Sequence, residues 1–265
     1  MIRLCHRLLS LFSLIMLVFA GCVSMRAKSE ESPTIVGDLA FDVTNSACCE
    51  IFVPEDMGLS PYLVLTSRYG GKDGYCLLLR KELLPNLVKY GTMPEAPYYG
   101  TCYIDSYLNS EFAEFLSDEV IALVLNTDIV ITASSSIWYD GSELESISRR
   151  FFLLSATECG FKSYASPLVE GEPIAYFDND IRRIVKLNNE ATAWWLRTPN
   201  TKNAFAWCVS YTGDMTFLDI ETELGVRPAF CLPAETPVIA FNVDGVNHYL
   251  LGTPDISKYA QNLKK

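Results

Sequence analysis

Histidine is almost absent from this sequence, and its scarcity limits the catalytic chemistry that the chain can perform. The 265 residues include two histidines, His6 and His248. His6 lies in an N-terminal targeting segment, so a catalytic unit of serine or cysteine with histidine would have to recruit His248. The nucleophile-elbow, zinc-protease, dinucleotide-binding and phosphate-loop motifs are also missing. We therefore expect a protein that is not an enzyme.

Basic residues are also in short supply. Lysine and arginine number 21 against 32 aspartates and glutamates, which gives a formal net charge of −11. Such an acidic surface repels the phosphates of nucleic acids, so we expect no nucleic-acid partner. The hydrophobic fraction of 49% is enough for a packed core and argues against a disordered chain.

Long hydrophobic runs are confined to the N-terminus. The apolar stretch over residues 8–19 follows basic residues and is too short for an ordinary membrane span, as in a signal peptide. The residues that follow, Val18-Phe19-Ala20-Gly21-Cys22, resemble a bacterial lipobox, in which the cysteine is lipidated. We predict an exported lipoprotein with a signal peptide at 1–21, a membrane anchor on Cys22 and a flexible tether at 22–33. An ordinary secretory signal is the alternative.

The C-x-x-C motif and the cysteine spacing of zinc ribbons are missing as well, so we expect neither that redox site nor that zinc site. Nine cysteines, less Cys5 and Cys22, leave seven in the exported domain, so at least one is unpaired within the chain. Cys208 and Cys231 both lie in apolar runs. Buried free thiols, a disulfide between these two residues and a copper-type thiolate site all stay open.

The most informative stretch of the chain runs from residue 194 to residue 232. Its start, Trp194-Trp195-Leu196-Arg197-Thr198-Pro199, predicts a strand buried on both faces, because successive side chains point to opposite sides. Residues 204–218 predict a hairpin with its turn at 212–214. Arg197 and Arg227 lie inside apolar runs, so each requires a carboxylate or backbone carbonyls as partners.

The rest of the chain predicts short elements of both kinds. Apolar spacing predicts a helix that carries Leu108, Phe112, Phe115 and Leu116 on one face, and a second helix over 174–187. The pattern Ser155-x-x-Glu158 predicts a capping box that opens another short helix. Further predictions are a hairpin over 62–79, a surface loop over 134–148 and a hairpin over 238–251.

Two motifs of the informative stretch carry a family resemblance. The residues Trp194-Trp195-Leu196-Arg197-Thr198-Pro199, followed by Gly225-Val226-Arg227-Pro228-Ala229, resemble a bacterial domain family of unknown function that occurs in secreted and lipid-anchored proteins. That family resembles the C-type-lectin-like fold, in the branch of formylglycine-generating enzymes. The resemblance covers roughly residues 60–233 and implies a mixed α+β fold with short helices packed on twisted antiparallel sheets. We expect a single domain over 34–233, and whether residues 34–60 belong to it stays open. Residues 234–265 would then form a C-terminal extension with an extra hairpin.

Loops between the last strands are the displayed surface of lectin-like folds, so a ligand is expected there. We expect Asn200, Lys202, Asn203, Tyr211 and Asp214 to contact it. The carboxylates of Asp219, Glu221 and Glu223, alternating along a strand, supply the hard oxygen ligands that calcium prefers.

The function expected from these features is a surface or envelope binding module for a glycan or a protein. Two alternatives stay open. One is an enzyme, either a cysteine-redox oxidase like the formylglycine-generating enzymes or a glycoside hydrolase with two carboxylates. The other is a purely structural envelope lipoprotein.

Overall fold

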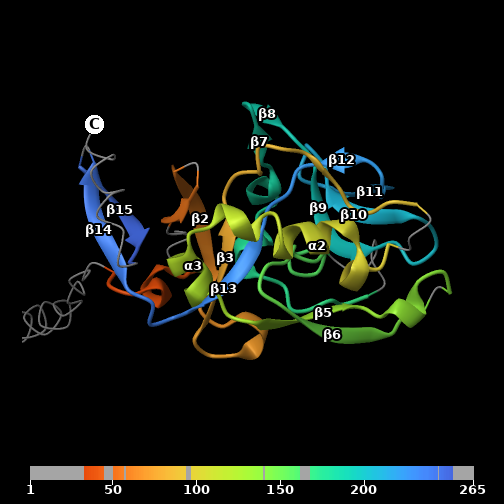
Figure 1. Cartoon of the computed structure of the whole chain (residues 1–265), viewed down its shortest axis with the longest axis horizontal. Coiled ribbons are helices and arrows are strands. Elements are labelled where there is room, and N and C mark those ends of the chain that lie inside the picture. Colours follow the sequence, from red (N-terminus) through yellow and green to blue (C-terminus); the bar gives the residue numbers. More distant parts are fainter. Residues whose placement is uncertain are drawn as a thin grey trace, which may run out of the picture. The chain divides into compact units, whose positions relative to one another are not determined.

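The fold combines many β-strands with short helices (Figure 1). The computed structural model describes residues 33–44, 50–56, 58–93, 97–139, 141–161, 168–243 and 245–252. Within these ranges the predicted mixed α+β class is confirmed. The proposed signal peptide, Cys22 and the tether up to residue 32 lie outside the described residues, as do Cys48 and Cys49. No helix in the described part is long and apolar enough to cross a membrane.

The larger sheet has six strands in the order β13-β3-β2-β1-β15-β14. All neighbouring strands are antiparallel except β1 and β15, which are parallel. The predicted hairpins over 62–79 and 238–251 are both confirmed in this sheet. The strands are β1 (Glu50–Glu55), β2 (Gly58–Thr66), β3 (Tyr75–Arg80), β13 (Ala229–Pro233), β14 (Val238–Val243) and β15 (Val246–Leu251).

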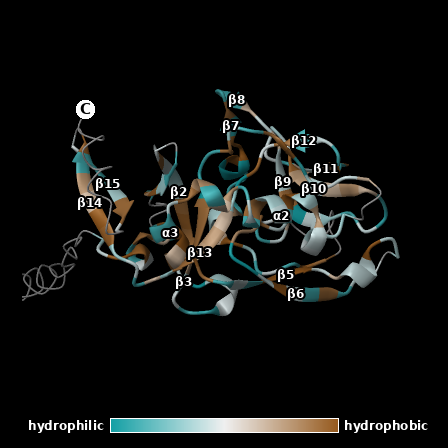
Figure 2. Cartoon of the chain, viewed as in Figure 1, coloured by the Kyte–Doolittle hydropathy of each residue, from teal (hydrophilic) through white to brown (hydrophobic). Residues whose placement is uncertain are grey.

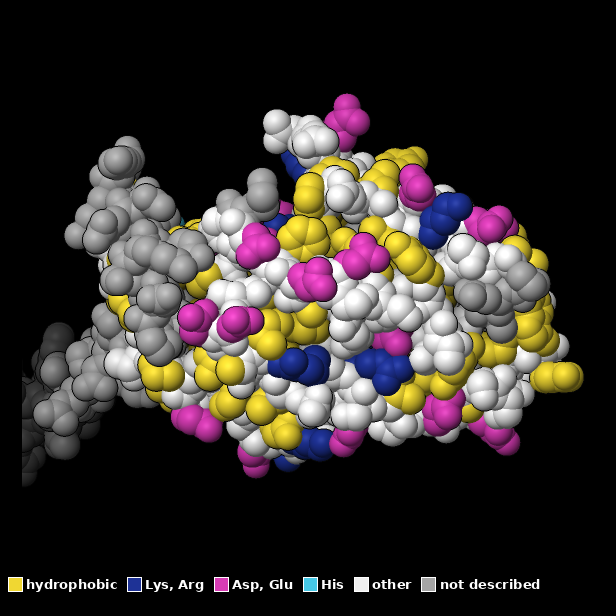
Figure 3. Space-filling view, in the orientation of Figure 1, with side chains coloured by type: hydrophobic (Ala, Val, Ile, Leu, Met, Phe, Trp, Pro, Cys, Tyr) yellow, Lys and Arg dark blue, Asp and Glu magenta, His cyan; other side chains and the backbone are white. Residues whose placement is uncertain are grey.

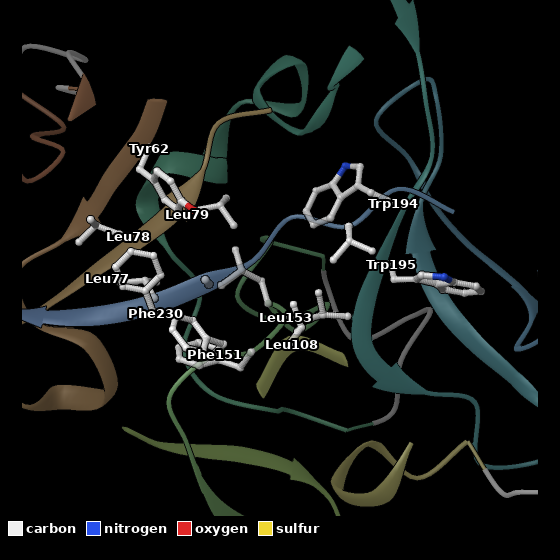
Figure 4. Packing of buried hydrophobic residues seen from close by; sticks show 14 of the residues in the cluster. Tyr62, Leu77, Leu78, Leu79, Leu108, Phe151, Leu153, Trp194, Trp195 and Phe230 are labelled. Atoms are coloured by element: carbon white, nitrogen blue, oxygen red, sulfur yellow. The ribbon is translucent and has the colours of Figure 1, made fainter. Parts of the chain in front are cut away.

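The sheet is buried on both faces at β3 and β13, as their continuous apolar sequences predict. In Figure 2, β2 and β3 are largely brown, the colour of hydrophobic residues. The Phe230 ring packs against Tyr62 on one side and Phe151 on the other, with centroid distances of 5.3 and 5.7 Å (Figure 4). Although β13 lies at the sheet edge, Phe152 bridges it by two backbone hydrogen bonds to Ala229.

The second sheet has three strands in the order β11-β10-β9. They are β9 (Trp194–Pro199), β10 (Phe205–Val209) and β11 (Met215–Asp219), and the predicted hairpin between β10 and β11 is confirmed. Every residue of β9 is buried, and Trp194 and Trp195 are both fully enclosed. Their indole N–H groups donate to the carbonyls of Arg183 and Val88, so neither buried donor is left unpaired.

Short elements connect and cover the two sheets. β5 pairs with β6, β4 with β12, and β7 with β8. These strands are β4 (Val88–Lys89), β5 (Thr127–Thr132), β6 (Leu144–Arg149), β7 (Lys186–Leu187), β8 (Glu190–Ala191) and β12 (Glu223–Leu224). In the described part of the chain, the α-helices are α2 (Tyr103–Asn109) and α3 (Asp118–Leu123). The 3₁₀ helices are η1 (Val36–Leu39), η2 (Tyr69–Gly71), η3 (Tyr99–Thr101), η4 (Ala113–Phe115), η5 (Ser134–Ser136), η6 (Ala175–Asp178) and η7 (Asp180–Arg183).

Two helix predictions are wrong in their extent because polar side chains bond to the backbone and interrupt the turns. The helix expected to reach Leu116 ends at Asn109, whose amide donates to the carbonyl of Phe151. The hydroxyl of Ser110 donates to the carbonyl of Ser106 at the same point. The helix expected over 174–187 is divided into η6 and η7, because Asn179 accepts from the N–H of Ile181.

Two further local predictions are corrected. The stretch 134–148 is not only a loop, because residues from Leu144 onward form β6, with alternating exposure against β5. The capping box of Ser155 and Glu158 is present as hydrogen bonds in both directions, at 3.0 and 3.1 Å, but a turn and no helix follows it. The Glu158 carboxylate also binds Arg197.

The fully buried guanidinium of Arg197 joins several segments of the domain. Its Nη1 and Nη2 donate to the two carboxylate oxygens of Glu158 at 2.6 and 2.8 Å. Nη1 also donates to the carbonyl of Leu153 at 2.9 Å, and Nε donates to that of Val130 at 3.0 Å. Burial is the largest single effect and lowers the pKa of Arg197, but the charge and hydrogen bonds of Glu158, together with Tyr69 and Glu170, raise that pKa above its usual value. The predicted requirement for a carboxylate or carbonyl partner is therefore confirmed.

A second buried carboxyl group belongs to the same network. Glu170 accepts from the backbone N–H and the hydroxyl of Thr132, each at 2.7 Å, and from the hydroxyl of Thr198. Burial raises the pKa of Glu170, while Arg197 and the hydrogen bonds lower it only in part. Tyr69 adds a hydrogen bond from its hydroxyl to Glu158 at 2.7 Å.

Arg227 is also buried, but it has no carboxylate partner, and its Nη1 has no hydrogen-bond partner among the described residues. Its Nε and Nη2 donate to the carbonyls of Arg80 and Lys81 at 3.1 and 3.3 Å. Its guanidinium carbon lies 5.0 Å from the centre of the Trp194 ring. Burial lowers the pKa of Arg227 to about 10. Carbonyl oxygens and an aromatic face therefore hold this cation between β3 and β9.

We predict that Arg197→Met destabilises the domain by about 3–5 kcal/mol, because it leaves Glu158 buried without its cation. The measurement is urea unfolding followed by tryptophan fluorescence. Arg68→Met is the control, since Arg68 pairs with Asp73 at the surface, and it should cost less than about 1 kcal/mol. A double variant that also carries Glu158→Leu should recover much of the loss. Near-native stability of the single variant would contradict the assigned role.

Candidate functional site

The residues expected to contact a ligand do not form one site. Asn200, Lys202 and Asn203 precede β10, whereas Tyr211 and Asp214 follow it. A strand rises about 3.3 Å per residue, so five residues separate the two groups by roughly 17 Å. Both groups lie in exposed or half-buried connections, as expected, but at opposite ends of the hairpin. The two groups therefore lie at different ends of β10, and their contact with a ligand stays a prediction.

The three carboxylates considered for calcium are also separated. β11 ends at Asp219, residues 220–222 turn, and Glu223 begins β12, so the expected alternation along one strand is wrong. Asp219 accepts from the N–H of Glu221 at 2.9 Å, and Glu221 accepts from that of Met93 at 3.3 Å. Among the residues that the structure describes, no group of three or more acidic, histidine or cysteine side chains could hold a metal ion.

The outward face of β10 and β11 carries three aromatic rings, which we call the aromatic face: Phe205, Trp207 and Phe217. Trp207 lies directly across from Phe217, with ring centroids 5.0 Å apart and the planes at 85°. Phe205 packs against the same ring at 5.7 Å. Phe217 is 45% exposed, and Trp207 and Phe205 are half-buried. Asp219 lies opposite Phe205 and adds an exposed carboxylate beside these rings.

A hollow of about 600 Å³ lies between α2, η4 and the β4–β12 pair, and we call it the tyrosine groove. Tyr107 is almost buried in it, while Tyr103, one helical turn earlier, is 43% exposed. Their ring centroids are 6.3 Å apart. Leu87 and Phe115 add apolar surface that is 41% and 37% exposed. The remaining lining residues are Asp56, Asn86, Val88, Lys89, Thr92, Glu111, Glu114 and Glu223.

The tyrosine groove carries a negative charge that the protein does not neutralise internally. Within the described chain, the side chains of Asp56, Glu111 and Glu114 take part in no hydrogen bond or ion pair. Lys89 lies across from Glu223 in the β4–β12 pair and offsets that one charge. The pKa of the Tyr107 phenol is raised, mainly by burial and less by the nearby Glu111 and Tyr103, so the phenol stays neutral. Figure 3 shows acidic and hydrophobic side chains mixed on the face that carries α2 and α3.

A second hollow of about 380 Å³ brings the carboxylates of Asp128, Glu158 and Glu172 together. Glu158 is already engaged, because Arg197 takes both of its oxygens, and Tyr69 and the N–H of Ser155 add further bonds. Asp128 pairs with Lys72 at 2.9 Å. These bonds explain the arrangement as part of the buried network. They leave Glu158 poorly suited to acid–base chemistry, which needs an oxygen that can exchange a proton with a substrate.

The described cysteines are Cys76, Cys102, Cys159, Cys208 and Cys231, and all five are buried free thiols. Cys208 belongs to the three-stranded sheet and Cys231 to the six-stranded sheet. The disulfide and the thiolate pair considered for these two residues are therefore contradicted. Burial raises the pKa of both thiols to about 12 and that of Cys76 to about 11, which keeps them protonated and unreactive near neutral pH.

Sequence reasoning missed the tyrosine groove, although part of its signal was present. Tyr103, Tyr107 and Glu111 follow one another at four-residue spacing, which places them on one side of a helix. The opposite wall comes from Asn86 to Lys89, in a proline-containing stretch without a periodic pattern. No local pattern shows that two such segments face each other.

Comparison with known proteins gives a family and no closer relative. A family model described as a domain of unknown function, DUF6273, matches residues 73–234. That range contains α2, β9, β10, β11 and most of both cavities. No curated protein and no solved structure matches the chain.

We predict that the five described cysteines resist a water-soluble disulfide reagent at pH 8 until the protein unfolds, because they are buried and protonated. The test uses the chain without residues 1–28 and with Cys48→Ser and Cys49→Ser, since these two cysteines lie outside the described residues. Labelling should be slow in buffer and should reach five thiols in urea without reductant. A rapidly labelled thiol, or fewer than five after unfolding, would contradict the structure.

Proposed function

The chain belongs to the DUF6273 family, a domain of unknown function, and we propose that it is a non-enzymatic binding module of the bacterial cell envelope. In this proposal a lipid on Cys22 holds the domain at a membrane, and residues 22–33 serve as its tether. The ligand is a glycan, which binds at the aromatic face. The single observation that supports this ligand is the exposed ring of Phe217 beside Trp207 on the rigid β10–β11 hairpin.

The chemistry of the aromatic face suits a sugar. The C–H faces of a pyranose ring pack against aromatic rings, and its hydroxyl groups donate to carboxylates. Phe205, Trp207 and Phe217 supply the rings, and Asp219 supplies an exposed carboxylate beside them. Large aromatic groups are usually buried, so three of them together at a surface indicate a contact site. Their position on paired strands keeps them in place before the ligand arrives.

We also propose that the domain is C-type-lectin-like, as the two tryptophan and arginine motifs imply. Short helices beside twisted antiparallel sheets support this assignment. An enzyme receives less support, because the described cysteines are buried thiols and Glu158 is held by Arg197. Adhesion to a protein at the cell envelope is the second candidate function. The tyrosine groove, which is separate from the aromatic face, favours it.

The fragment 29–265 is suited to the test because residues 33–265 form one compact unit. We predict that it binds at least one glycan on an array. The double variant Trp207→Ala/Phe217→Ala should weaken this binding at least about tenfold, or about 1.4 kcal/mol. The surface variant Phe217→Ser alone should also weaken it, without risk to the core. Binding should be the same in calcium and in a chelator, because the nearby carboxylates are separated.

The matched control is Tyr139→Ala, which removes an aromatic ring that is 81% exposed and lies outside the hairpin. It should bind as the unmodified protein does. Near-ultraviolet circular dichroism of each variant would show whether the core is intact. Failure to bind any glycan, or equal binding by the folded Phe217→Ser variant, would contradict the proposed ligand.

A further inference from the structure

We propose that the tyrosine groove is a second binding site, and that it takes an extended polypeptide segment in which lysine or arginine residues lie next to apolar residues. This site shares no residue with the aromatic face, and its ligand belongs to another chemical class. It therefore does not depend on the proposed glycan. It assigns a partner surface to α2, η4 and β4, elements to which the glycan proposal gives no role.

Charge is the first argument for a basic ligand. Asp56, Glu111 and Glu114 are exposed carboxylates around one hollow, and none is paired within the described residues. Lys89, the one cation of the lining, faces Glu223. A groove with an excess of one charge focuses the electric field and attracts ligands of the opposite charge. Complementary charge of this kind accelerates encounter and selects the partner.

Exposed apolar surface is the second argument, and it is independent of charge. Leu87, Tyr103 and Phe115 are between 37% and 43% exposed, although residues of these types are mostly buried. They lie in a hollow, where a ligand side chain can contact several of them together. Exposed apolar side chains with a polar rim mark protein contact sites. The faces of the tyrosine rings also attract ammonium and guanidinium groups.

A polypeptide combines these two properties better than other ligands do. A nucleic acid would be repelled by the carboxylates, and a neutral glycan would leave their charges without partners. A basic and apolar peptide can place cations at the rim and hydrocarbon on Leu87 and Phe115. The volume of about 600 Å³ lies within the usual range of roughly 300–1,000 Å³ for ligand sites, which is enough for a few side chains.

The test is fluorescence anisotropy of residues 29–265 with a short fluorescein-labelled peptide in which lysine alternates with leucine and phenylalanine. We expect saturable binding that weakens as salt is added, because exposed charges are screened. The groove variant Asp56→Asn/Glu111→Gln/Glu114→Gln should bind at least about tenfold more weakly. The matched control is Glu82→Gln/Asp178→Asn/Glu190→Gln, which removes the same charge from exposed residues outside the groove and should bind normally.

Two further peptides separate the contributions of charge and apolar contact. One replaces lysine by glutamate and should not bind, and the other replaces leucine and phenylalanine by serine and should bind at least about tenfold more weakly. If the groove variant and the control variant lose the same peptide affinity, net charge alone explains the binding and the proposal is overturned. Failure to bind the first peptide, or self-association of the protein through this face instead, would also overturn it. The Phe217→Ser variant should keep full peptide affinity, so failure of the glycan proposal remains distinguishable.

Discussion

The buried guanidinium of Arg197 is the constraint on which the arrangement of the domain depends. A charged group in the interior is costly unless it is paired and hydrogen-bonded, and this one reaches Glu158 and the carbonyls of Val130 and Leu153. Arg197 lies in β9, while its partners lie in β5 and in the segment that bridges β13 through Phe152. The requirement to satisfy one cation therefore fixes the three-stranded sheet relative to the edge of the six-stranded sheet.

Two surfaces follow from this fixed arrangement. The hairpin of β10 and β11 continues from β9, so its inner residues pack against the core and its aromatic rings stay outside. The tyrosine groove forms beside β12, which pairs with β4 after the chain leaves the hairpin. Trp195 helps to hold β4 in place through its hydrogen bond to the carbonyl of Val88. Both proposed ligands therefore meet side chains that the core has already positioned.

Local chemistry made part of this structure predictable. The burial of Trp194 and Trp195, the hairpin after them and the need of Arg197 for partners all follow from apolar sequence and the cost of an unpaired charge. The sequence does not predict that Glu158 is the partner of Arg197, because Glu158 lies 39 residues away and its capping-box pattern indicates a helix. Calcium ligands were expected because Asp219, Glu221 and Glu223 alternate along the sequence as on one strand. The chain turns after Asp219, so the three carboxylates do not share a strand. The groove joins segments that are distant in sequence, so no single pattern contains it.

Native-state hydrogen exchange of the unmodified protein and of Arg197→Met tests the central claim most directly. If the Arg197 network joins the two sheets, amides of β3, β9, β10 and β13 should open with similar free energies in the unmodified protein. In Arg197→Met, β9 and β10 should then exchange at a lower free energy than β3 and β13. Equal loss of protection in both sheets, or unchanged protection of β9 and β10, would contradict the account.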